Sequence, residues 1–396
     1  MKTFDWIVIG NGITGAAVSY ELARAGASVL LLEQSSQPQN ATRYSYGGIA
    51  YWSGTTDLTR QLCQEGIDLH RSLPAELGAD TQFRELDLLL TIEPNRDPQQ
   101  IAATYTDCTI SPKILSPAEA QAIEPRLNAA AVAGALLLPH GHVSPEANVL
   151  AYNQAFLRLG GTLDIAQVTG LVQSGQQVQG VVATNITYEA GNVVVCVGGY
   201  SRTLLRSFGF PIRLYYTQAE LIEIPPTDLQ LRSIVMPAEL KRPHLEATAA
   251  KAELDALWDE PNHEVTPAIL DAGAIQFQDG RIRMGQFSRT FTDPQARFDA
   301  AASEAAMRTA VGTLLPDLKS LAGQWHSCLV AFSRDGLPVI GALPNTTGIH
   351  IFSGFNSPFV LAPPVARRFA RHAASNAVNL DPLLTQLAPD RLWDER

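Results

Sequence analysis

The sequence predicts an α/β fold of two or three domains, and three observations lead to this prediction. The chain has 396 residues, whereas a typical domain has roughly 150. Hydrophobic residues make up 46% of it and charged residues 17%, which is the composition of a globular chain with a large buried core. Residues 4–33 alternate between buried-strand and helix patterns, which is typical of a parallel sheet covered by helices.

The first forty residues contain the clearest motif. Residues 4–9 form an apolar run typical of a buried strand and lead directly into Gly10-Asn11-Gly12-Ile13-Thr14-Gly15. Good helix formers follow over residues 16–25, and a second apolar strand over residues 28–32 ends at Glu33. This order of strand, G-x-G-x-x-G turn, helix, strand and acidic residue predicts a dinucleotide-binding unit.

The glycines and the acidic residue of this unit each have a physical role. Gly10 permits the tight turn, Gly12 lets a pyrophosphate approach the backbone, and Gly15 lets the helix pack closely on the strand. The pyrophosphate would bind at the helix N-terminus, where unpaired N–H groups point outward. Glu33 would accept hydrogen bonds from a ribose hydroxyl. The motif alone leaves FAD and NAD as alternatives.

The rest of the chain mixes helix and strand patterns. Helices are predicted over residues 58–73, 147–159, 247–259, 300–315 and 363–377, and strands over 83–92, 162–168, 178–184, 192–197 and 212–224. A hairpin over residues 274–286 turns at Asp279-Gly280. The acidic helix at 247–259 is either a lid or a solvent-facing helix, and we favour the second. The pairs Gly47-Gly48 and Gly198-Gly199 are either simple turns or places where backbone approaches a flat ligand.

Charge and cysteine content exclude several classes of protein. The 29 Lys and Arg residues against 39 Asp and Glu give a formal charge of −10, which repels a phosphate backbone, so we expect no nucleic-acid partner. The four cysteines are widely spaced and the histidines lack metal-ligand spacing. We therefore expect no disulfide framework, no metal site and a reducing cytoplasm as the location.

No membrane span or secretion signal is expected. The longest run of small and apolar residues, 129–138, is shorter than the ~20 residues that cross a bilayer. Asp5 stands where a signal peptide needs its apolar core. The sequence makes no prediction about the oligomeric state.

Six segments, taken in order, resemble the FAD-dependent amine oxidase family that includes D-amino-acid oxidase, glycine oxidase and monomeric sarcosine oxidase. They are the N-terminal unit up to Glu33 and residues 46–49, 143–145, 193–201, 335–341 and 348–364. The resemblance covers nearly the whole chain. It implies a Rossmann-like FAD-binding domain made of residues 1–80, 141–211 and 325–396. It also implies a discontinuous α+β substrate-binding domain, residues 81–140 and 212–324, built on an antiparallel sheet.

The resemblance also assigns cofactor-binding residues. It implies that the pyrophosphate is held by the first turn of the motif, that Glu33 and Gln34 lie by the adenosine, and that Val168 meets the adenine. Arg43, Gly47, Gly48 and Gly198 would lie by the cofactor, and the turn 355–358 would lead into the final helix with Pro358 at its first position. The full predicted set is Gly10, Gly12, Ile13, Thr14, Gly15, Glu33, Gln34, Arg43, Gly47, Gly48, Val168, Gly198, Phe355, Asn356, Ser357 and Pro358.

The implied reaction removes a hydride from a C–H bond next to an amine nitrogen, passes it to flavin N5 and leaves an imine that water hydrolyses. The substrate would be a small amine or amino acid, and the electrons would pass to O2 or to another acceptor. Two alternatives remain. One is a dehydrogenase of the same fold that reduces a quinone or a carrier protein. The other is a flavin-binding protein without this catalysis.

The sequence departs from the family where the substrate carboxylate is bound. Glycine and D-amino-acid oxidases place an arginine where this chain has Val330, and sarcosine oxidases place a lysine where it has Val360. The other usual anchors, an arginine and a tyrosine, fall at Tyr51 and Gly273. Either another arginine serves (Arg213, Arg242 or Arg289) or the substrate lacks an α-carboxylate.

Four aromatic residues are candidates for a pocket facing a cationic amine: Tyr51, Trp52, Tyr215 and Tyr216. Ordinary core packing is the alternative for all four. Cys328 lies seven residues before Asp335, the spacing at which sarcosine oxidases attach FAD through a cysteine sulfur. The alternatives for Cys328 are therefore a covalent flavin link and a buried free thiol, and we favour the thiol.

Overall fold

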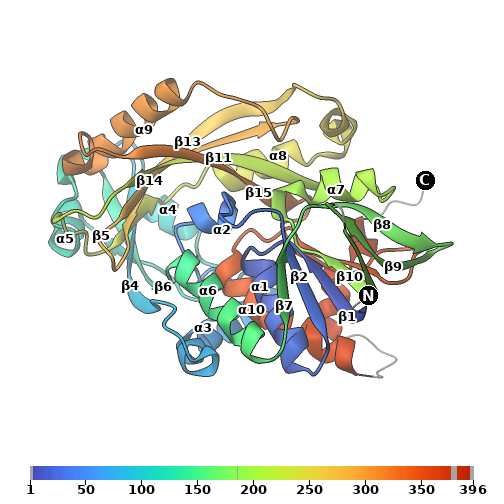
Figure 1. The fold of residues 1–396 in the computed structure, drawn as a ribbon. Helices are drawn as coiled ribbons and strands as arrows, with labels where there is room; N and C mark the ends of the chain where they lie inside the picture. Colours follow the sequence, from blue (N-terminus) through green and yellow to red (C-terminus); the bar gives the residue numbers. More distant parts are fainter. Residues whose placement is uncertain (1–2, 185, 376–380, 393–396) are drawn as a thin grey trace.

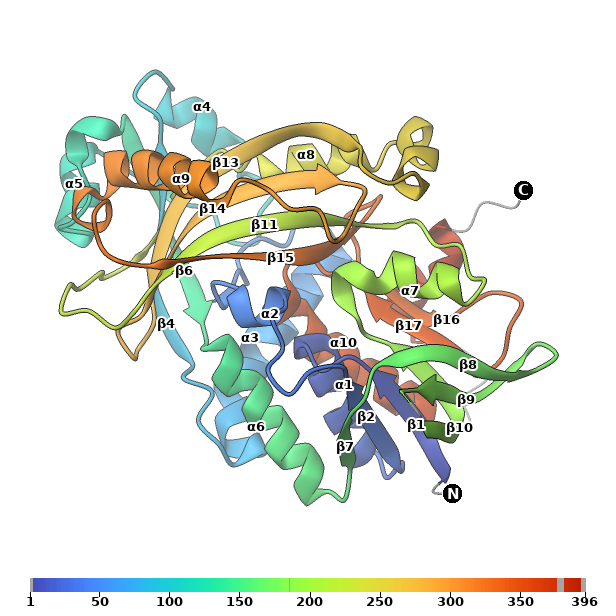
Figure 2. The same cartoon turned by 45° about the horizontal axis from the view of Figure 1, so that its top comes forward.

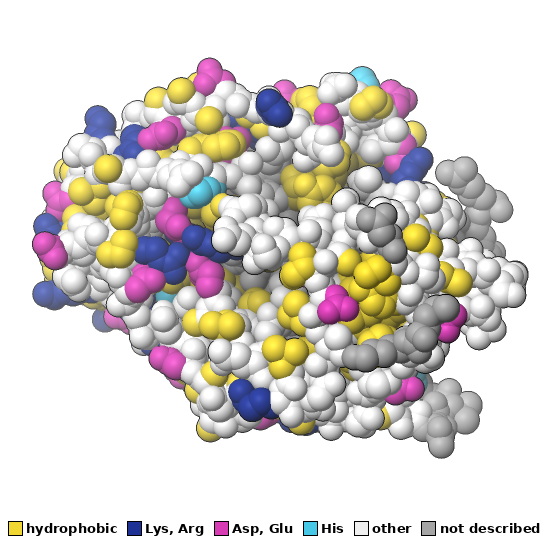
Figure 3. Space-filling view, viewed as in Figure 1, with side chains coloured by type: hydrophobic (Ala, Val, Ile, Leu, Met, Phe, Trp, Pro, Cys, Tyr) yellow, Lys and Arg dark blue, Asp and Glu magenta, His cyan; other side chains and the backbone are white. Residues whose placement is uncertain are grey.

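The computed structural model describes residues 3–184, 186–375 and 381–392. It contains two large sheets, with the short helix α2 (Ala41–Tyr44) between them (Figures 1 and 2). Parallel and antiparallel strands and covering helices together confirm the predicted α/β class. No helix in the described part of the chain is long and apolar enough to cross a membrane. On the face shown in Figure 3, Lys and Arg side chains are interspersed with Asp and Glu.

The first sheet carries the predicted dinucleotide unit. Its strand order is β16-β17-β10-β1-β2-β7, parallel from β17 to β7, with the hairpin β8–β9 joined to β10. The strands are β1 (Thr3–Ile9), β2 (Val29–Glu33), β7 (Thr162–Ile165), β8 (Val168–Ser174), β9 (Gln177–Ala183), β10 (Ile186–Val195), β16 (Val339–Ala342) and β17 (Ile349–Ser353). The predicted strands 4–9 and 28–32 and the helix after the glycine turn are confirmed.

The second sheet has the order β15-β11-β14-β13-β12-β4-β6-β3, with β5 beside β6, and is mostly antiparallel. Its strands are β3 (Gly48–Ile49), β4 (Arg84–Ile92), β5 (Lys113–Leu115), β6 (Gly134–His142), β11 (Leu214–Ile224), β12 (Ile234–Pro237), β13 (Glu264–Gln276), β14 (Ile282–Phe291) and β15 (Gln324–Ser333). The predicted domain boundaries place β3 and β15 with the FAD-binding residues, whereas both are strands of this sheet. The boundaries themselves stay a prediction.

Helices cover both sheets. They are α1 (Ile13–Arg24), α2, α3 (Asp57–Leu77), α4 (Pro98–Ala103), α5 (Pro117–Ile123), α6 (Pro145–Arg158), α7 (Ser201–Ser207), α8 (Arg242–Ala249), α9 (Ala300–Leu314), α10 (Pro358–Ala374) and α11 (Pro382–Leu387). The side chains of α1, α3, α6 and α10 pack on one face of the first sheet, against Trp6, Val8 and Leu31. The other face packs on the β8–β9 hairpin and α7.

The helix predicted over residues 247–259 is wrong. The structure ends α8 at Ala249 and continues as two short 3₁₀ turns, Ala252–Leu254 and Ala256–Asp259. Trp258 explains the difference, because its ring is buried against Tyr215 and Tyr216 and its indole N–H donates to the Ala249 carbonyl at 2.9 Å. Burial of the Trp258 ring stabilises the fold more than continuation of an exposed helix would.

The final helix begins earlier than its sequence pattern predicts, at Pro358, although Pro363 and Pro364 lie inside it. Proline has no N–H, so the carbonyls of Phe359 and Val360, four residues earlier, lose their helical donors. The neighbouring helix α3 provides a donor for the Phe359 carbonyl. His70 of α3 lies 2.6 Å by its Nε2 from the Phe359 oxygen, and Gly66 brings the α3 backbone against the Val360 oxygen, where a Cβ would lie only 2.0 Å away.

Four histidines shielded from water make stability depend on pH: His70, His140 and His142 are buried, and His350 is half-buried. Because Phe359 offers only an acceptor, His70 Nε2 carries the proton, and the ring is neutral with Nδ1 buried and unpartnered within the described residues. Burial lowers the pKa of His70 and of His350 to about 4 and that of His140 to about 3, and it lowers the pKa of His142 as well. An unfolded chain protonates these rings near pH 6.5, whereas the folded protein does not.

We therefore expect the free energy of unfolding to fall as the pH drops from about 6.5 towards 4, by roughly 1 kcal/mol per pH unit for each such histidine. The variant His70→Gln keeps an N–H donor and does not titrate, so it should lose one histidine's share of this slope. Urea unfolding at pH 7.5, 6.5 and 5.5 measures it. The exposed His263→Gln variant is the control, and equal slopes for the two variants would contradict the prediction.

Candidate functional site

A cavity of about 660 Å³ runs from the glycine-rich turn of the first sheet to strands β11 and β15 of the second. Its walls also include the end of β2, the segment from Pro38 to Thr42, the β7–β8 link, the segment after β10, α7 and residues 294–296. Glu33 is its one charged residue among those described, and no lysine or arginine lines it. An anionic ligand here would therefore depend on backbone N–H groups and helix dipoles.

The glycine-rich turn has the close backbone approaches that the sequence predicts. Gly10 has φ +99°, and a Cβ there would lie 2.8 Å from the Cys196 oxygen. A Cβ on Gly15 would lie 1.8 Å from the Gly10 oxygen, so only glycine lets α1 pack this closely on β1. Gly12 is the N-cap of α1 and provides no side-chain hydrogen bond. The first turn of α1 thus presents its dipole to the cavity.

Glu33 connects this turn to the end of β2. Its Oε2 accepts a hydrogen bond from the Asn11 N–H at 2.8 Å, and its Oε1 accepts one from Ser35 at 3.3 Å. Nearby, the Ile13 N–H donates to Thr42 Oγ1 of α2 at 3.1 Å. The Asn11 Oδ1 atom is buried without a partner in the described part of the chain. A ribose and pyrophosphate fit this arrangement of an acid, an orphaned oxygen and a glycine cradle.

The structure brings many of the predicted cofactor residues to the cavity. Its walls include Gly10, Gly12, Thr14, Glu33, Gln34, Val168 and Gly198. Ile13 and Gly15 lie directly behind, in the first turn of α1. Gly47 and Gly48 pack instead against Val143 and His140, and the turn 355–358 lies at the start of α10, where Asn356 donates to the Gly336 carbonyl at 3.1 Å. Cys196, Thr42 and α7 are wall elements that the sequence analysis missed.

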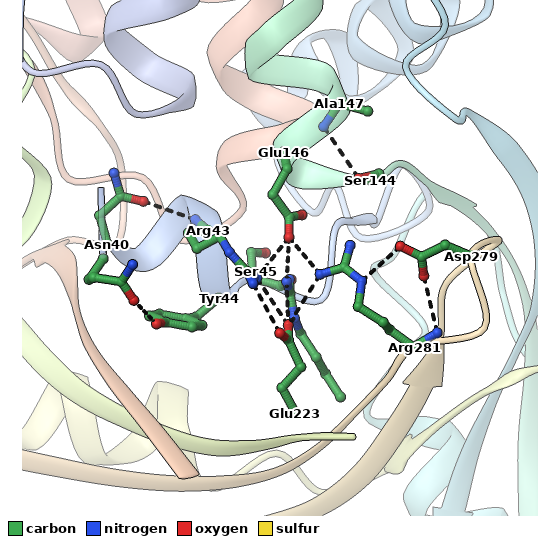
Figure 4. A network of polar contacts seen from close by, with 12 residues as sticks. Asn40, Arg43, Tyr44, Ser45, Ser144, Glu146, Ala147, Glu223, Asp279 and Arg281 are labelled. Carbon is green, nitrogen blue, oxygen red and sulfur yellow. Dashed lines mark hydrogen bonds and ion pairs between the residues drawn. The ribbon is translucent and has the colours of Figure 1, made fainter. Parts of the chain in front are cut away.

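The structure places Arg43 in an ion network, directly after the cavity-wall residue Thr42. Its guanidinium lies in this network with Glu146, Glu223 and Arg281, shown in Figure 4. Arg283 contacts the same two carboxylates. Two nitrogens of Arg43 contact the two Glu223 oxygens at 3.0 and 2.9 Å, and its Nη1 lies 2.7 Å from Glu146. With this bidentate pairing the guanidinium is already engaged, because carboxylates match its planar fork.

The network joins the two sheets. Glu223 lies on β11 and Arg283 on β14, whereas Arg43 is on α2 and Glu146 on the first turn of α6. Arg283 is fully buried, contacts both carboxylates, and also donates to the Ser45 carbonyl, one residue before Tyr46-Gly47-Gly48. Burial opposes ionisation of Glu223, but hydrogen bonds from Arg43 and the charge of Arg283 outweigh it and lower its pKa to about 2.

The four candidate aromatic residues are not brought together. Trp52 packs beside Tyr105 and donates to His140 Nδ1 at 3.0 Å, while Tyr51 contacts Glu85. Tyr215 and Tyr216 belong to another cluster around Trp258 and Phe332, where the Tyr215 hydroxyl donates to Asp255 at 2.8 Å. This is the core packing that the sequence left as the alternative. A single aromatic cage from all four is therefore not part of the function we propose.

Cys328 lies in the cavity wall, on β15. Burial raises the pKa of its thiol to about 12, so in the folded chain it is protonated at neutral pH, and the thiolate that a covalent bond needs is disfavoured. Val330, two residues further along the strand, is also partly buried and packs near Tyr44 and Ala41 of α2. The described residues hold no group of three or more His, Cys, Asp or Glu side chains that could bind a metal.

Comparison with known proteins identifies the family. Residues 5–372 match the protein family described as FAD dependent oxidoreductase. This chain belongs to that family. The predicted cofactor, FAD, and the oxidoreductase class are thereby confirmed.

Individual relatives of the family are distant. The chain is 23% identical over 402 residues to a 4-methylaminobutanoate oxidase (formaldehyde-forming) of Paenarthrobacter nicotinovorans, covering 95% of this chain but only 44% of that protein. Glycine oxidase from Geobacillus kaustophilus has the same fold, with a TM-score of 0.78 at 20% identity over 98% of this chain and 99% of that one. L-proline dehydrogenase from P. horikoshii matches with a TM-score of 0.76 at 17% identity, covering 98% of each chain.

The ion network generates a stability prediction. Glu223→Gln should lower the free energy of unfolding at pH 7 by about 3 kcal/mol, because the buried guanidinium of Arg283 and that of Arg43 lose a shared carboxylate. Urea unfolding measures the change. The control, Asp317→Asn, breaks the exposed pair with Arg126 and should cost less than about 1 kcal/mol. Equal small effects in both variants would show that the network does not stabilise the fold.

Proposed function

We propose that this protein oxidises a carbon–nitrogen bond of a small amine or amino acid, as glycine and sarcosine oxidases do. The observation that carries the proposal is the continuous cavity, which begins at Glu33 and the N-terminus of α1 and ends at Cys328 and Leu329 of the antiparallel sheet. A cofactor held along it would bring its reactive ring under that sheet, where a substrate has room to bind.

Bound FAD would supply the two-electron acceptor for the C–H bond next to the nitrogen, and water would hydrolyse the imine product. The chain's own residues bind and orient. Glu33 would accept the ribose hydroxyl, and the first turn of α1 would face the pyrophosphate. The Arg283 contact with the Ser45 carbonyl would hold the loop that leads into Gly47 and Gly48. In this proposal positioning provides most of the rate enhancement, so no acid–base pair is required.

A dehydrogenase is the second candidate. The fold match with L-proline dehydrogenase favours it, since that protein has the same architecture over nearly its whole length. The two candidates share the reductive half of the reaction and differ in the acceptor. Stoichiometric peroxide formation in air supports an oxidase, whereas reduction of a quinone analogue with little peroxide supports a dehydrogenase.

The decisive experiment is anaerobic. The purified holoprotein, which should absorb near 450 nm as oxidised flavins roughly do, is mixed with a panel of amines, N-methyl amines and amino acids. We expect at least one of them to bleach the flavin. A protein without flavin, or a flavin that no member of the panel reduces, would overturn the proposal, and the second result would favour a flavin-binding role without catalysis.

The cofactor site has its own test. Glu33→Ala should weaken FAD binding to the apoprotein by about tenfold to a hundredfold, because the ribose loses a charged acceptor and the Asn11 N–H loses its partner. Fluorescence titration with FAD measures this. Asp5→Asn, at the opposite end of β1 beside Ser28, is the matched control, and equal affinities in both variants would contradict the assignment of Glu33.

The state of Cys328 determines whether the flavin is bound covalently or non-covalently. Since its thiol is protonated in the fold, we expect all of the flavin to appear in the supernatant after acid precipitation. Flavin that stays with the wild-type pellet but is released from Cys328→Ser would show a covalent link and contradict this expectation.

A further inference from the structure

The sheet face next to the cavity lacks the arginine that glycine oxidases use, and its register shows what stands there instead. Val330 on β15 is the direct partner of Thr217 on β11, and Cys328 is the direct partner of Ala219. Directly opposite residues of antiparallel strands project to the same face. The cavity wall includes Cys328 and its strand neighbours Ser327 and Leu329, and Thr217 and Val330 are the next pair beyond Ala219 and Cys328 on the same face of the sheet.

Helix α8 places a charged group on this pair. The Thr217 hydroxyl, fully buried, donates to Glu246 Oε1 at 2.7 Å, and Arg242 Nε donates to the same oxygen at 2.7 Å. Arg242 and Glu246 are one helical turn apart, so both side chains leave α8 on one side. The hydrogen bonds therefore tie the Arg242 side chain to the position where the family's arginine would project from residue 330.

The backbone of Arg242 is fixed as well. The carboxylate of Asp271 on β13 accepts from the N–H groups of Lys241 and Arg242 at 3.1 and 3.2 Å, which caps the start of α8. Backbone and side chain are thus both held before any ligand arrives. Such preorganisation lowers the entropy cost of binding.

Arg242 retains unused donors. Within the described residues only its Nε has a hydrogen-bond partner, and the side chain is one-fifth exposed, so Nη1 and Nη2 remain available. These two groups can bind a carboxylate. Its charge also reaches Cys328, where it opposes the burial that raises the pKa of the thiol.

The other arginines considered from the sequence are committed elsewhere. Arg289 donates to Glu220 and to Ser303 of α9, and its guanidinium stacks on Phe287 and Phe298. Arg289 is paired with Gln218, the neighbour of Thr217, so it projects to the opposite face of the sheet. Arg213 pairs with Asp255.

We propose that Arg242 binds the substrate carboxylate in place of an arginine at position 330, and that the substrate is an amino acid with a free carboxylate rather than a simple amine. This inference rests on the proposed function. Glu246 and Thr217 are positioning residues, which fix the guanidinium so that its Nη1 and Nη2 edge faces the substrate. A site of this kind binds an analogue without the carboxylate more weakly, because the Nη1 and Nη2 donors of Arg242 then lack the partner that the carboxylate supplies.

The test compares an amino acid that reduces the flavin with its carboxamide, which keeps the amine and removes the charge. Arg242→Met should raise the dissociation constant of the amino acid, measured by anaerobic flavin reduction, by tenfold or more and leave that of the carboxamide within about twofold. Acetate provides a readout without turnover, since it should perturb the flavin absorbance of the wild type and do so far more weakly in Arg242→Met. The surface variant Arg126→Met is the control.

Three further variants test the positioning roles. Arg242→Lys keeps the charge and loses the fork, so it should bind the amino acid with intermediate affinity. Thr217→Val should weaken amino-acid binding in the same direction and lower the thermal midpoint, because the buried Glu246 carboxylate loses a donor. Thr217→Ser keeps the hydroxyl and should restore both, with flavin content unchanged.

The outcomes distinguish this inference from the proposed function. If wild type and Arg242→Met bind the amino acid and acetate equally, or if both ligand types weaken together, Arg242 is not the anchor although the oxidation stands. If only amines without a carboxylate reduce the wild-type flavin, the substrate class is wrong while the proposed function holds. If nothing in the panel reduces it, the proposed function itself fails.

Discussion

The buried contact between Arg283 and the carboxylates of Glu146 and Glu223 is the constraint on which the two-sheet arrangement depends. The guanidinium has no exposed surface, and an unpaired charge in that place would cost several kcal/mol. It can be satisfied only when β14, β11 and the first turn of α6 meet at one point. Arg43 adds a second bridge from α2, so the antiparallel sheet is fixed over the nucleotide-binding unit by charged groups from four elements.

That fixed arrangement gives the cavity its two chemically different ends. At the first sheet, the walls are glycine backbone, a helix N-terminus and Glu33, which suit a ribose and a pyrophosphate. At the second sheet, the walls are Cys328 and Leu329, with Thr217 and Val330 just beyond. No lysine or arginine lines the described cavity itself, so recognition of an anionic substrate group would depend on a charge from outside that lining, which is the role that we propose for Arg242.

Helix α10 also has buried polar groups that a distant part of the chain must satisfy. Two prolines in its early turns remove helical donors, and the exposed carbonyls would be costly if they were buried without partners. A neutral histidine of α3 donates to the Phe359 carbonyl, and Gly66 lets the α3 backbone lie close to the Val360 carbonyl. The start of α10 is thereby fixed by α3. This contact makes stability sensitive to acid, because burial lowers the pKa of His70 and the ring takes up a proton more readily in the unfolded chain than in the folded one.

The sequence by itself determined the elements whose signals are local. The strand, glycine turn, helix, strand and Glu33 lie within thirty residues, and each has a spacing that predicts it, so their positions and a dinucleotide cofactor could be predicted before any coordinates. The choice of FAD over NAD came from the resemblance to the amine oxidase family. The hairpin at Asp279-Gly280 is predictable for the same reason. The departures at Val330 and Val360 are visible only by comparison with the family that the sequence resembles.

Only the tertiary structure decided what replaces those losses. Arg242 and Val330 are 88 residues apart in the chain, and nothing in local spacing shows that α8 brings the arginine to the face of β15. Arg43 likewise pairs with carboxylates on α6 and β11, which lie far from it in the chain. Trp258 ends a predicted helix by packing inward against Tyr215 and Tyr216. In each case the contact joins residues that are far apart in the chain, so local spacing could not predict it.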